Sequence, residues 1–172
     1  MAQAFIGLGA NLGGGMDALA QQLRQAIARL HALPGIQVTR ISGAYRSAPV
    51  DANGPDFLNA VVQLQTSLLP LELLDGLQAI EAEFGRERLF HNAPRTLDLD
   101  LLWYDALVLN DPRLTLPHPR AAARSFVMLP LAELTPSLVW SEAKSVQELA
   151  ASISGQRIER LGISLELEGI ST

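Results

Sequence analysis

The stretch RTLDLDLL, residues 95–102, alternates apolar and acidic side chains and decides how the chain folds. A period of two predicts a β-strand with one buried face, because successive side chains of a strand point to opposite sides. The leucines at odd positions would enter a core. Asp98 and Asp100 would share the opposite face, about 6.6–6.8 Å apart along the chain.

Two aspartates on one face of a strand need a compensating cation, because like charges repel and aspartate is disfavoured in strands. Carboxylate oxygens suit Mg²⁺, which takes one or two carboxylates and completes its shell with water and substrate phosphates. The simpler alternative is a strand face solvated by water. Arg95 directly precedes the strand and Pro94 stiffens the chain there. This places a guanidinium close to the pair and favours phosphate chemistry.

The composition is that of a globular protein with a single core. The 172 residues are 48% hydrophobic and 18% charged, and we expect one domain over residues 1–172 with an uncertain tail from about residue 157. No apolar run approaches the roughly 18 residues of a membrane span, and no signal peptide precedes the first strand. These features predict a cytoplasmic protein without membrane contact.

Charge and cysteine content exclude several kinds of function. The net charge of −5 argues against a nucleic-acid-binding surface, which is normally basic. The chain has no cysteine, which excludes disulfides, thiolate catalysis and cysteine-ligated zinc or iron–sulfur centres.

Arginine is almost the only basic residue, since Lys144 is the single lysine. Its planar fork of donors suits phosphate, although a composition bias of the whole genome would give the same skew. The positions are more informative, because six arginines fall within about forty residues around the acidic strand. They are Arg86, Arg88, Arg95, Arg113, Arg120 and Arg124. We interpret the first two, in the charged loop before the strand, as a phosphate clamp.

The rest of the chain shows strand and helix patterns in turn. Glycines in the turn over residues 9–15 do not fit a dinucleotide fingerprint, because Leu12 stands where glycine is required, nor a P-loop. In the first half of the chain, the patterns predict a strand at 5–9, a helix at 16–33 ending with an exposed His31, and a β segment at 36–45 with a phase slip after Val38. A loop at 46–56, a strand at 57–66 and a helix from 69 capped by Gly85 follow. After the acidic strand, they predict a return strand at 107–109 pairing with it, an apolar run at 127–131 broken by Pro130, a weak helix at 146–153 and an edge strand with a loose tail at 157–172.

The strand at 57–66 carries an aromatic ring and an amide on one face. Phe57 and Asn59 alternate with the apolar residues that would enter the core. By themselves they favour an ordinary outward face. The functional alternative is a ring that stacks on a heterocycle beside an amide that pairs with its edge.

His118 lies between two prolines, Pro117 and Pro119, and is therefore held rigidly. It could simply pack against its surroundings. Together with the arginines at 113, 120 and 124 it would instead form a second cationic cluster after the acidic strand.

An ordered set of motifs runs along nearly the whole chain, from about residue 4 to residue 155. The motifs are GANL (9–12), YRSAP (45–49), DFLNA (56–60), Glu81 with GRER (85–88), PRTLDLD (94–100), LPH (116–118) and RSF (124–126). In this order and spacing they identify a resemblance to the 6-hydroxymethyl-7,8-dihydropterin pyrophosphokinases of folate biosynthesis.

The resemblance implies a fold and a reaction. The fold is a monomeric ferredoxin-like α+β structure, with a mainly antiparallel sheet flanked by helices in three αβα layers. The reaction transfers the pyrophosphoryl group of ATP to the hydroxymethyl oxygen of the pterin and releases AMP. ATP is thus a co-substrate, and neither nucleic acid nor membrane is a partner.

The resemblance also implies residue roles. Asp98 and Asp100 would hold two Mg²⁺ ions and, with Arg86 and Arg95, form the catalytic group. The positions that match ATP contacts are Gln78, Glu81, Arg88, Arg95, Leu101, Arg113, Thr115, His118 and Arg124. Those that match pterin contacts are Ser47, Ala48, Val50, Phe57, Asn59 and Phe126.

Some alternatives stay open at this point. Either Phe90 or His91 stands where a loop tryptophan is common in the family, and Phe57 replaces a common tyrosine. The rival functions are another Mg²⁺-dependent transferase that acts on nucleotides and a non-catalytic ligand-binding module on the same fold.

Overall fold

The computed structural model of the chain describes residues 1–11, 15–49, 54–86 and 97–170. Its helices are α1 (Met16–Ala32), α2 (Pro70–Arg86), α3 (Ser125–Leu134) and α4 (Val146–Ser152), with a 3₁₀ turn η1 (Ala121–Ala123). Its strands are β1 (Ala2–Ala10), β2 (Ile36–Ile41), β3 (Ala44–Ser47), β4 (Phe57–Thr66), β5 (Asp98–Tyr104), β6 (Leu109–Asp111), β7 (Leu114–Leu116), β8 (Val139–Ser141), β9 (Lys144–Ser145) and β10 (Ile158–Leu161).

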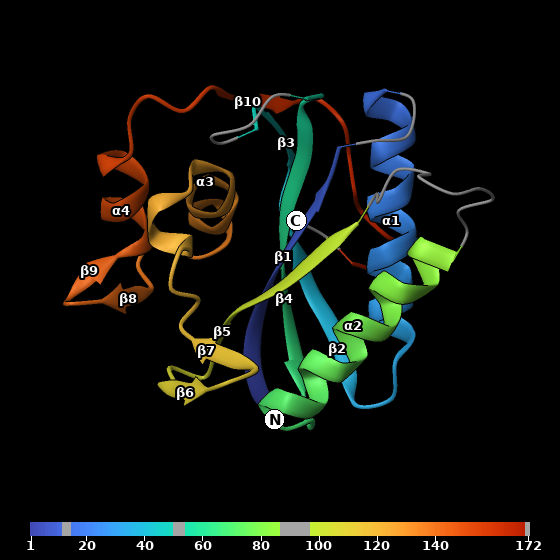
Figure 1. The fold of residues 1–172 in the computed structure, drawn as a ribbon, viewed down its shortest axis with the longest axis vertical. Helices are drawn as coiled ribbons and strands as arrows, with labels where there is room; N and C mark the ends of the chain where they lie inside the picture. The colour runs from blue at the N-terminus through green and yellow to red at the C-terminus, as the bar shows by residue number, and fades with distance from the viewer. Residues whose placement is uncertain (12–14, 50–53, 87–96, 171–172) are drawn as a thin grey trace.

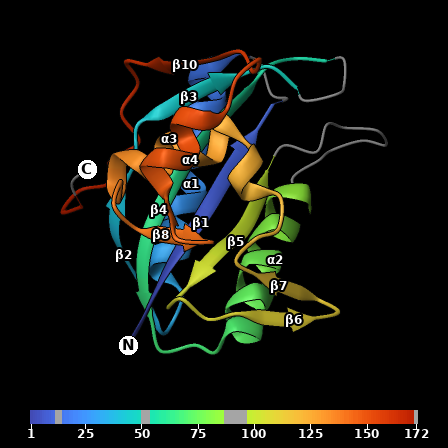
Figure 2. The ribbon, with the colours of Figure 1, turned by 90° about the vertical axis from the view of Figure 1, so that its left-hand side faces the viewer.

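A six-stranded sheet forms the middle of three layers. Its order is β10-β3-β4-β1-β5, with β2 also pairing with β4, and its pairs are antiparallel. Helices α1 and α2 cover one face, and α3 and α4 cover the other (Figure 1). A quarter turn brings α3 and α4 in front of the sheet (Figure 2). This architecture confirms the predicted three-layer α+β fold.

The acidic strand sends its leucines into the larger core, as the alternation predicts. Leu97, Leu99 and Leu101 are 2–4% exposed and belong to the cluster that α1 and α2 pack against. Burying one such side chain stabilises the fold by about 1.5–3 kcal/mol, which fixes the orientation of β5. No helix in the described ranges is long and apolar enough to cross a membrane.

A second core cluster lies on the opposite face, between the sheet and α3. It includes Phe5, Val61, Trp103 and Met128, and the two rings lie 5.5 Å apart between centroids. The face of β4 that carries Asn59 is therefore covered by a helical layer. Its interpretation as an ordinary outward face is wrong, because a single strand cannot reveal the second layer.

Several elements match the sequence patterns closely. Helix α1, strand β4 and helix α4 lie where the periodicity predicts them, and His31 is exposed. The phase slip after Val38 is an irregularity in the β2–β4 register between Val38 and Arg40. The predicted loop at 46–56 begins later than expected, since β3 includes residues 46 and 47.

Three local predictions are wrong for identifiable reasons. Gly85 is not a cap, because α2 continues to Arg86 and Gly85 has no positive φ. Strand β6 pairs with β7 and not with β5, because Leu109–Asp111 forms its own antiparallel pair with Leu114–Leu116. Pro130 does not break α3, whose buried apolar residues on both sides hold the helix in place.

The C-terminal segment packs more firmly than the predicted loose tail. Strand β10 forms the edge of the sheet beside β3, as expected. After it, Leu165 is 1% exposed within the larger core, and Arg24 of α1 donates a hydrogen bond to the carbonyl of Ser164 at 2.9 Å. This segment therefore packs against the layer formed by α1 and α2.

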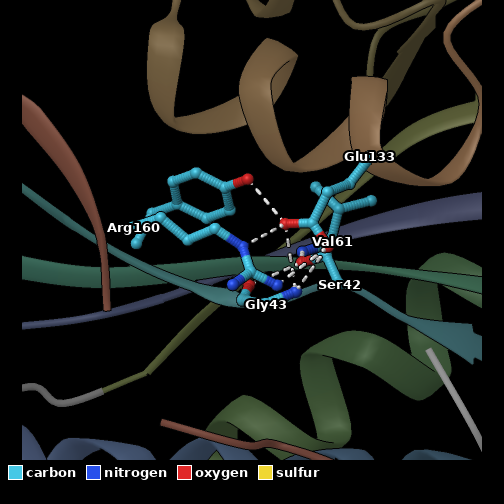
Figure 3. A network of polar contacts seen from close by, with 6 residues as sticks. Ser42, Gly43, Val61, Glu133 and Arg160 are labelled. Carbon is cyan, nitrogen blue, oxygen red and sulfur yellow. Dashed lines mark hydrogen bonds and ion pairs between the residues drawn. The ribbon is translucent and has the colours of Figure 1, made fainter. Parts of the chain in front are cut away.

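A carboxylate ties α3 to the sheet (Figure 3). Glu133 accepts hydrogen bonds from the Gly43 N–H at 3.1 Å, from the Tyr45 hydroxyl and from Arg160 Nε at 3.1 Å. A Cβ on Gly43 would lie 2.6 Å from the Arg160 guanidinium, so a side chain at this position would displace the end of Arg160. Burial raises the pKa of Glu133, but the hydrogen bonds from Arg160, Tyr45 and Gly43 outweigh it, and its pKa is lowered.

We expect Glu133→Gln to lower the free energy of unfolding by about 1–2 kcal/mol near neutral pH, because the charge-assisted hydrogen bonds are lost. The pKa is lower in the folded than in the unfolded chain. The ionised carboxylate therefore stabilises the fold above its ordinary pKa of 4.5, and this contribution is lost as pH falls through the folded pKa. Urea unfolding of the parent protein and of Glu133→Gln, from neutral pH to below the folded pKa, measures the difference.

The control for this experiment is Glu142→Gln, at an exposed position in the β8–β9 turn. It should change stability by less than about 0.5 kcal/mol. A Glu133→Gln effect that stays constant in acid would contradict the role of the charge.

Candidate active site

A pocket of about 750 Å³ lies on the sheet face that α3 partly covers. This is within the size range of small-ligand sites. Eight of the residues that the sequence predicts for the site line it together, although they come from four separate parts of the chain. They are Ser47, Ala48, Phe57, Asn59, Asp98, Asp100, Arg124 and Phe126.

Strand register brings the two halves of the pocket together. Gly9 of β1 lies opposite Asn59 on one side and opposite Asp98 on the other. Directly opposite residues share a face, so the amide and the carboxylate stand on the same side of the sheet. Two strand spacings separate their backbones by about 10 Å. In the next row Asp100 lies opposite Gly7.

Two glycines form the floor of this pocket, and the sequence interpretation missed them. Both Gly7 and Gly9 line it, and a Cβ on Gly9 would lie 3.0 Å from Asn59 Nδ2 and 4.0 Å from Phe57 Cδ1. Only a residue without a side chain leaves room between the amide and the carboxylates. Glycines two apart in a strand are the signal that could have revealed this floor.

Asn59 is held in a fixed orientation. It is 5% exposed, and its Oδ1 accepts a hydrogen bond from the Ser47 hydroxyl at 2.6 Å. Its Nδ2 is the atom closest to the glycine floor. The amide is therefore preorganised to meet a polar ligand edge without further ordering.

The carboxylates at the other end fit a hard divalent cation. Asp98 is exposed, Asp100 is half-buried, and both line the pocket. The described part of the chain gathers no group of three or more histidines, aspartates or glutamates suited to a metal. Such a pair matches Mg²⁺, which takes its other ligands from water and phosphate, better than a closed structural metal site.

Glu81 lies at the outer edge of β5 and does not line the pocket. Its carboxylate accepts a hydrogen bond from the Leu99 N–H at 2.9 Å and so satisfies a backbone group of an edge strand. Leu101, two residues on, turns its backbone groups to the same edge, while its side chain is buried.

Cationic and aromatic side chains form the wall that α3 contributes. The Arg124 guanidinium carbon lies 5.5 Å from the centroid of the half-buried Phe126 ring. Burial lowers the pKa of His118, the Asp100 charge opposes this shift, and the charges of Arg124 and Arg120 add to it. His118 Nδ1 accepts the Arg120 N–H at 3.2 Å, so the neutral ring carries its proton on Nε2.

The other predicted residues either do not line the pocket or lie outside the described ranges. Arg113 Nη2 contacts Asp75 at 2.6 Å and Gln78 at 3.3 Å on α2, and Thr115 is exposed on β7 nearby. Together with Glu81, Leu101 and His118, they are not among the pocket-lining residues. Val50, Arg88, Phe90, His91, Arg95 and the side chain of Arg86 are outside the described part.

The fold and the pocket define a class of protein. It is an α+β protein whose antiparallel sheet presents a carboxylate pair, arginines and a ring-and-amide slot, a set suited to a phosphate-bearing ligand and a flat heterocycle. The family model for 7,8-dihydro-6-hydroxymethylpterin-pyrophosphokinase (HPPK) matches residues 5–136. The chain belongs to this family.

Relatives in several bacteria support the assignment. The chain is 42% identical over 167 residues to 2-amino-4-hydroxy-6-hydroxymethyldihydropteridine pyrophosphokinase of Synechocystis sp., covering 96% of this chain and 84% of that protein. It is 41% identical over 160 residues to the protein of the same name in Pseudomonas aeruginosa, covering 92% and 96%.

Solved structures share the fold. A crystal structure of Plasmodium falciparum HPPK-DHPS superposes with a TM-score of 0.65 at 13% identity and covers 88% of this chain. The same protein with pteroate gives 0.68 at 12% identity and 87% coverage. The chain spans 43% and 44% of these two longer proteins.

We expect Gly9→Ala to lower pyrophosphokinase kcat/KM by about tenfold or more. The new methyl group would meet Asn59 Nδ2 at 3.0 Å, and the bond to Ser47 prevents that amide from moving aside. Steady-state kinetics measure the change, and thermal unfolding checks that the fold persists.

The control is Gly162→Ala, where a Cβ meets nothing within 4 Å. It should leave kcat/KM unchanged. Equal activity of Gly9→Ala and the parent protein would exclude the glycine floor as a requirement of the site.

Proposed function

We propose that the chain transfers the β,γ-pyrophosphoryl group of ATP to the hydroxymethyl oxygen of 6-hydroxymethyl-7,8-dihydropterin, a step of folate biosynthesis. The oxygen attacks the β-phosphorus, the bond from that phosphorus to the α,β-bridging oxygen breaks, and AMP leaves. Family membership supports this reaction. The observation that carries it is one pocket with carboxylates at one end and a ring-and-amide slot at the other.

Asp98 and Asp100 are the proposed holders of two Mg²⁺ ions. Bound Mg²⁺ would neutralise phosphate charge and make the β-phosphorus more electrophilic. Asp100, the more buried of the pair, is the better candidate to accept the hydroxymethyl proton.

Arginines and polar groups would bind and orient ATP. Arg86 and Arg95 are the proposed partners of the moving pyrophosphoryl group, an electrostatic role in which an arginine can supply a factor of about 10³ or more. The further ATP contacts that we propose are Gln78, Glu81, Arg88, Leu101, Arg113, Thr115, His118 and Arg124. The position of Arg113 beside Gln78 supports one patch of contacts at the β5 edge.

The pterin would lie at the other end of the pocket. Phe57 and Phe126 are proposed to sandwich its ring, and the fixed Asn59 amide to pair with its polar edge. Ser47, Ala48 and Val50 would add contacts from the neighbouring loop. Aromatic stacking supplies affinity, and the amide supplies selectivity for one heterocycle.

We further propose that residues 1–172 act as one domain and one monomeric unit in the cytoplasm, where ATP is supplied. Leu165 packs in the same core cluster as Ala4, which supports a single unit. ATP and the dihydropterin are the proposed partners, without nucleic acid or membrane.

The deciding test is incubation with ATP, Mg²⁺ and the dihydropterin, followed by chromatography of the nucleotides. We expect AMP to form only when both pterin and metal are present. Chelation should stop the reaction, and added Mg²⁺ should restore it. Formation of ADP would instead indicate a simple kinase, and the absence of turnover would indicate a binding module.

We expect Asp100→Asn to reduce kcat by about 10³-fold or more, because the amide neither binds Mg²⁺ well nor accepts a proton. The surface variant Asp17→Asn on α1 is the matched control and should keep full activity. Near-normal turnover by a folded Asp100→Asn protein would refute the carboxylate assignment.

We expect Asn59→Ala to raise the KM for the pterin by about tenfold or more and to change the KM for ATP much less. The reason is that the amide lies at the ring end of the pocket, about two strand spacings from Asp98. Steady-state kinetics with each substrate varied separate the two effects. Equal losses for both substrates would argue against a pterin contact.

A further inference from the structure

The segment after α4 joins two walls of the pocket. Gly155, with φ of 77°, turns the chain toward β10. The Arg157 carbonyl then accepts a hydrogen bond from the Ala48 N–H at 3.2 Å, which extends the β10–β3 pairing to the loop beside the slot. Arg157 also forms an ion pair with Asp56 at 2.8 Å, just before Phe57.

Gln156 of this segment reaches the opposite wall. Its Oε1 accepts a hydrogen bond from the Ser125 N–H at 2.9 Å, and its Nε2 donates one to the Ala123 carbonyl at 2.8 Å. These bonds bracket Arg124, the N-cap residue of α3, whose own side chain makes no capping hydrogen bond. Gln156 therefore caps the first amide of α3 from 31 residues further along the chain.

The start of α3 borders open space on one side. A second hollow of about 400 Å³ lies next to the main pocket and is lined by Phe126, Ser125 and Gln156 together with the loop around Ala48. Because space lies on this side of the Phe126 ring, few atoms resist a shift of the helix start. The two hydrogen bonds of Gln156 are the side-chain contacts that oppose such a shift, beside the backbone bond from the Arg124 N–H to the Ala121 carbonyl.

We propose that Gln156 is a positioning residue for the pterin: it holds the start of α3 and thereby sets the spacing between Phe126 and Phe57. The inference rests on the proposed function and deepens it. Gln156 lies beyond residue 136, where the family match ends, yet its side chain lines the main pocket. The C-terminal segment thus completes the binding slot.

The test uses Gln156→Met, which keeps the length of the side chain and removes both hydrogen bonds. We expect the KM for the pterin to rise roughly three- to tenfold, the range for one or two lost hydrogen bonds. The KM for ATP should rise by no more than about twofold, because Arg124 is one ATP contact among several, and kcat should change equally little. Gln147→Met, at an exposed position on α4, is the matched control and should leave all three constants unchanged.

A double variant shows whether Gln156 acts through the ring. Once Phe126→Ala has removed the ring, Gln156→Met should add no further increase in the KM for the pterin. Additive effects of the two changes would overturn the proposal, as would an equal loss for both substrates accompanied by a lower Tm.

The same set of variants separates this inference from the proposed function. If Phe126→Ala raises the KM for the pterin and Gln156→Met does not, the positioning role fails and the pterin site stands. If Phe126→Ala leaves the KM for the pterin unchanged, the proposed pterin site itself fails.

Discussion

The register between β1 and β5 is the constraint on which the rest of the molecule depends. It places Asp98 opposite Gly9 and Asp100 opposite Gly7, with the leucines of β5 on the other face. A slip of one residue would send both carboxylates into the apolar core and the leucines into the pocket. The unfavourable burial of two charges makes such a slip far more costly than any local propensity could offset. One apolar face therefore orients both the core and the candidate site.

An open pocket beside a packed layer requires that α3 be held by more than apolar contacts. Near its C-terminal end, Glu133 connects it to Gly43, Tyr45 and Arg160. At its N-terminal end, Gln156 connects it to the segment before β10. Arg160 and Gln156 both belong to the C-terminal part of the chain. This late segment consequently holds the helix at both ends, while the middle of α3 packs on the sheet through residues such as Met128.

Periodicity predicts elements well where one apolar face dominates, as in α1, β4 and β5. It fails where packing against a second layer, or the pairing of short strands, determines the structure. The β4 face that carries Phe57 and Asn59 mixes polar and apolar side chains. Its burial is explained by α3, which covers it. The β6–β7 hairpin is formed by two strands of only three residues each, too short for a periodicity to reveal. For the site, the charged and aromatic residues are visible in the sequence. The glycine floor and Gln156 are not, because their roles arise from a neighbouring strand and a distant segment.

The charge distribution explains how an acidic chain can present an anion site. At a net charge of −5 the whole molecule repels a polyphosphate, so attraction has to be local. Several arginines are neutralised by carboxylates, among them Arg113 by Asp75 and Arg160 by Glu133. Within the described ranges, Arg120 and Arg124 form no such ion pair, and both line the pocket. Their charges and that of Asp100 all act on the His118 ring, so cations and a carboxylate share this region. Cations on the helical wall and carboxylates on the strand therefore suit a ligand that arrives with its own counter-ion, as a metal-bound polyphosphate does.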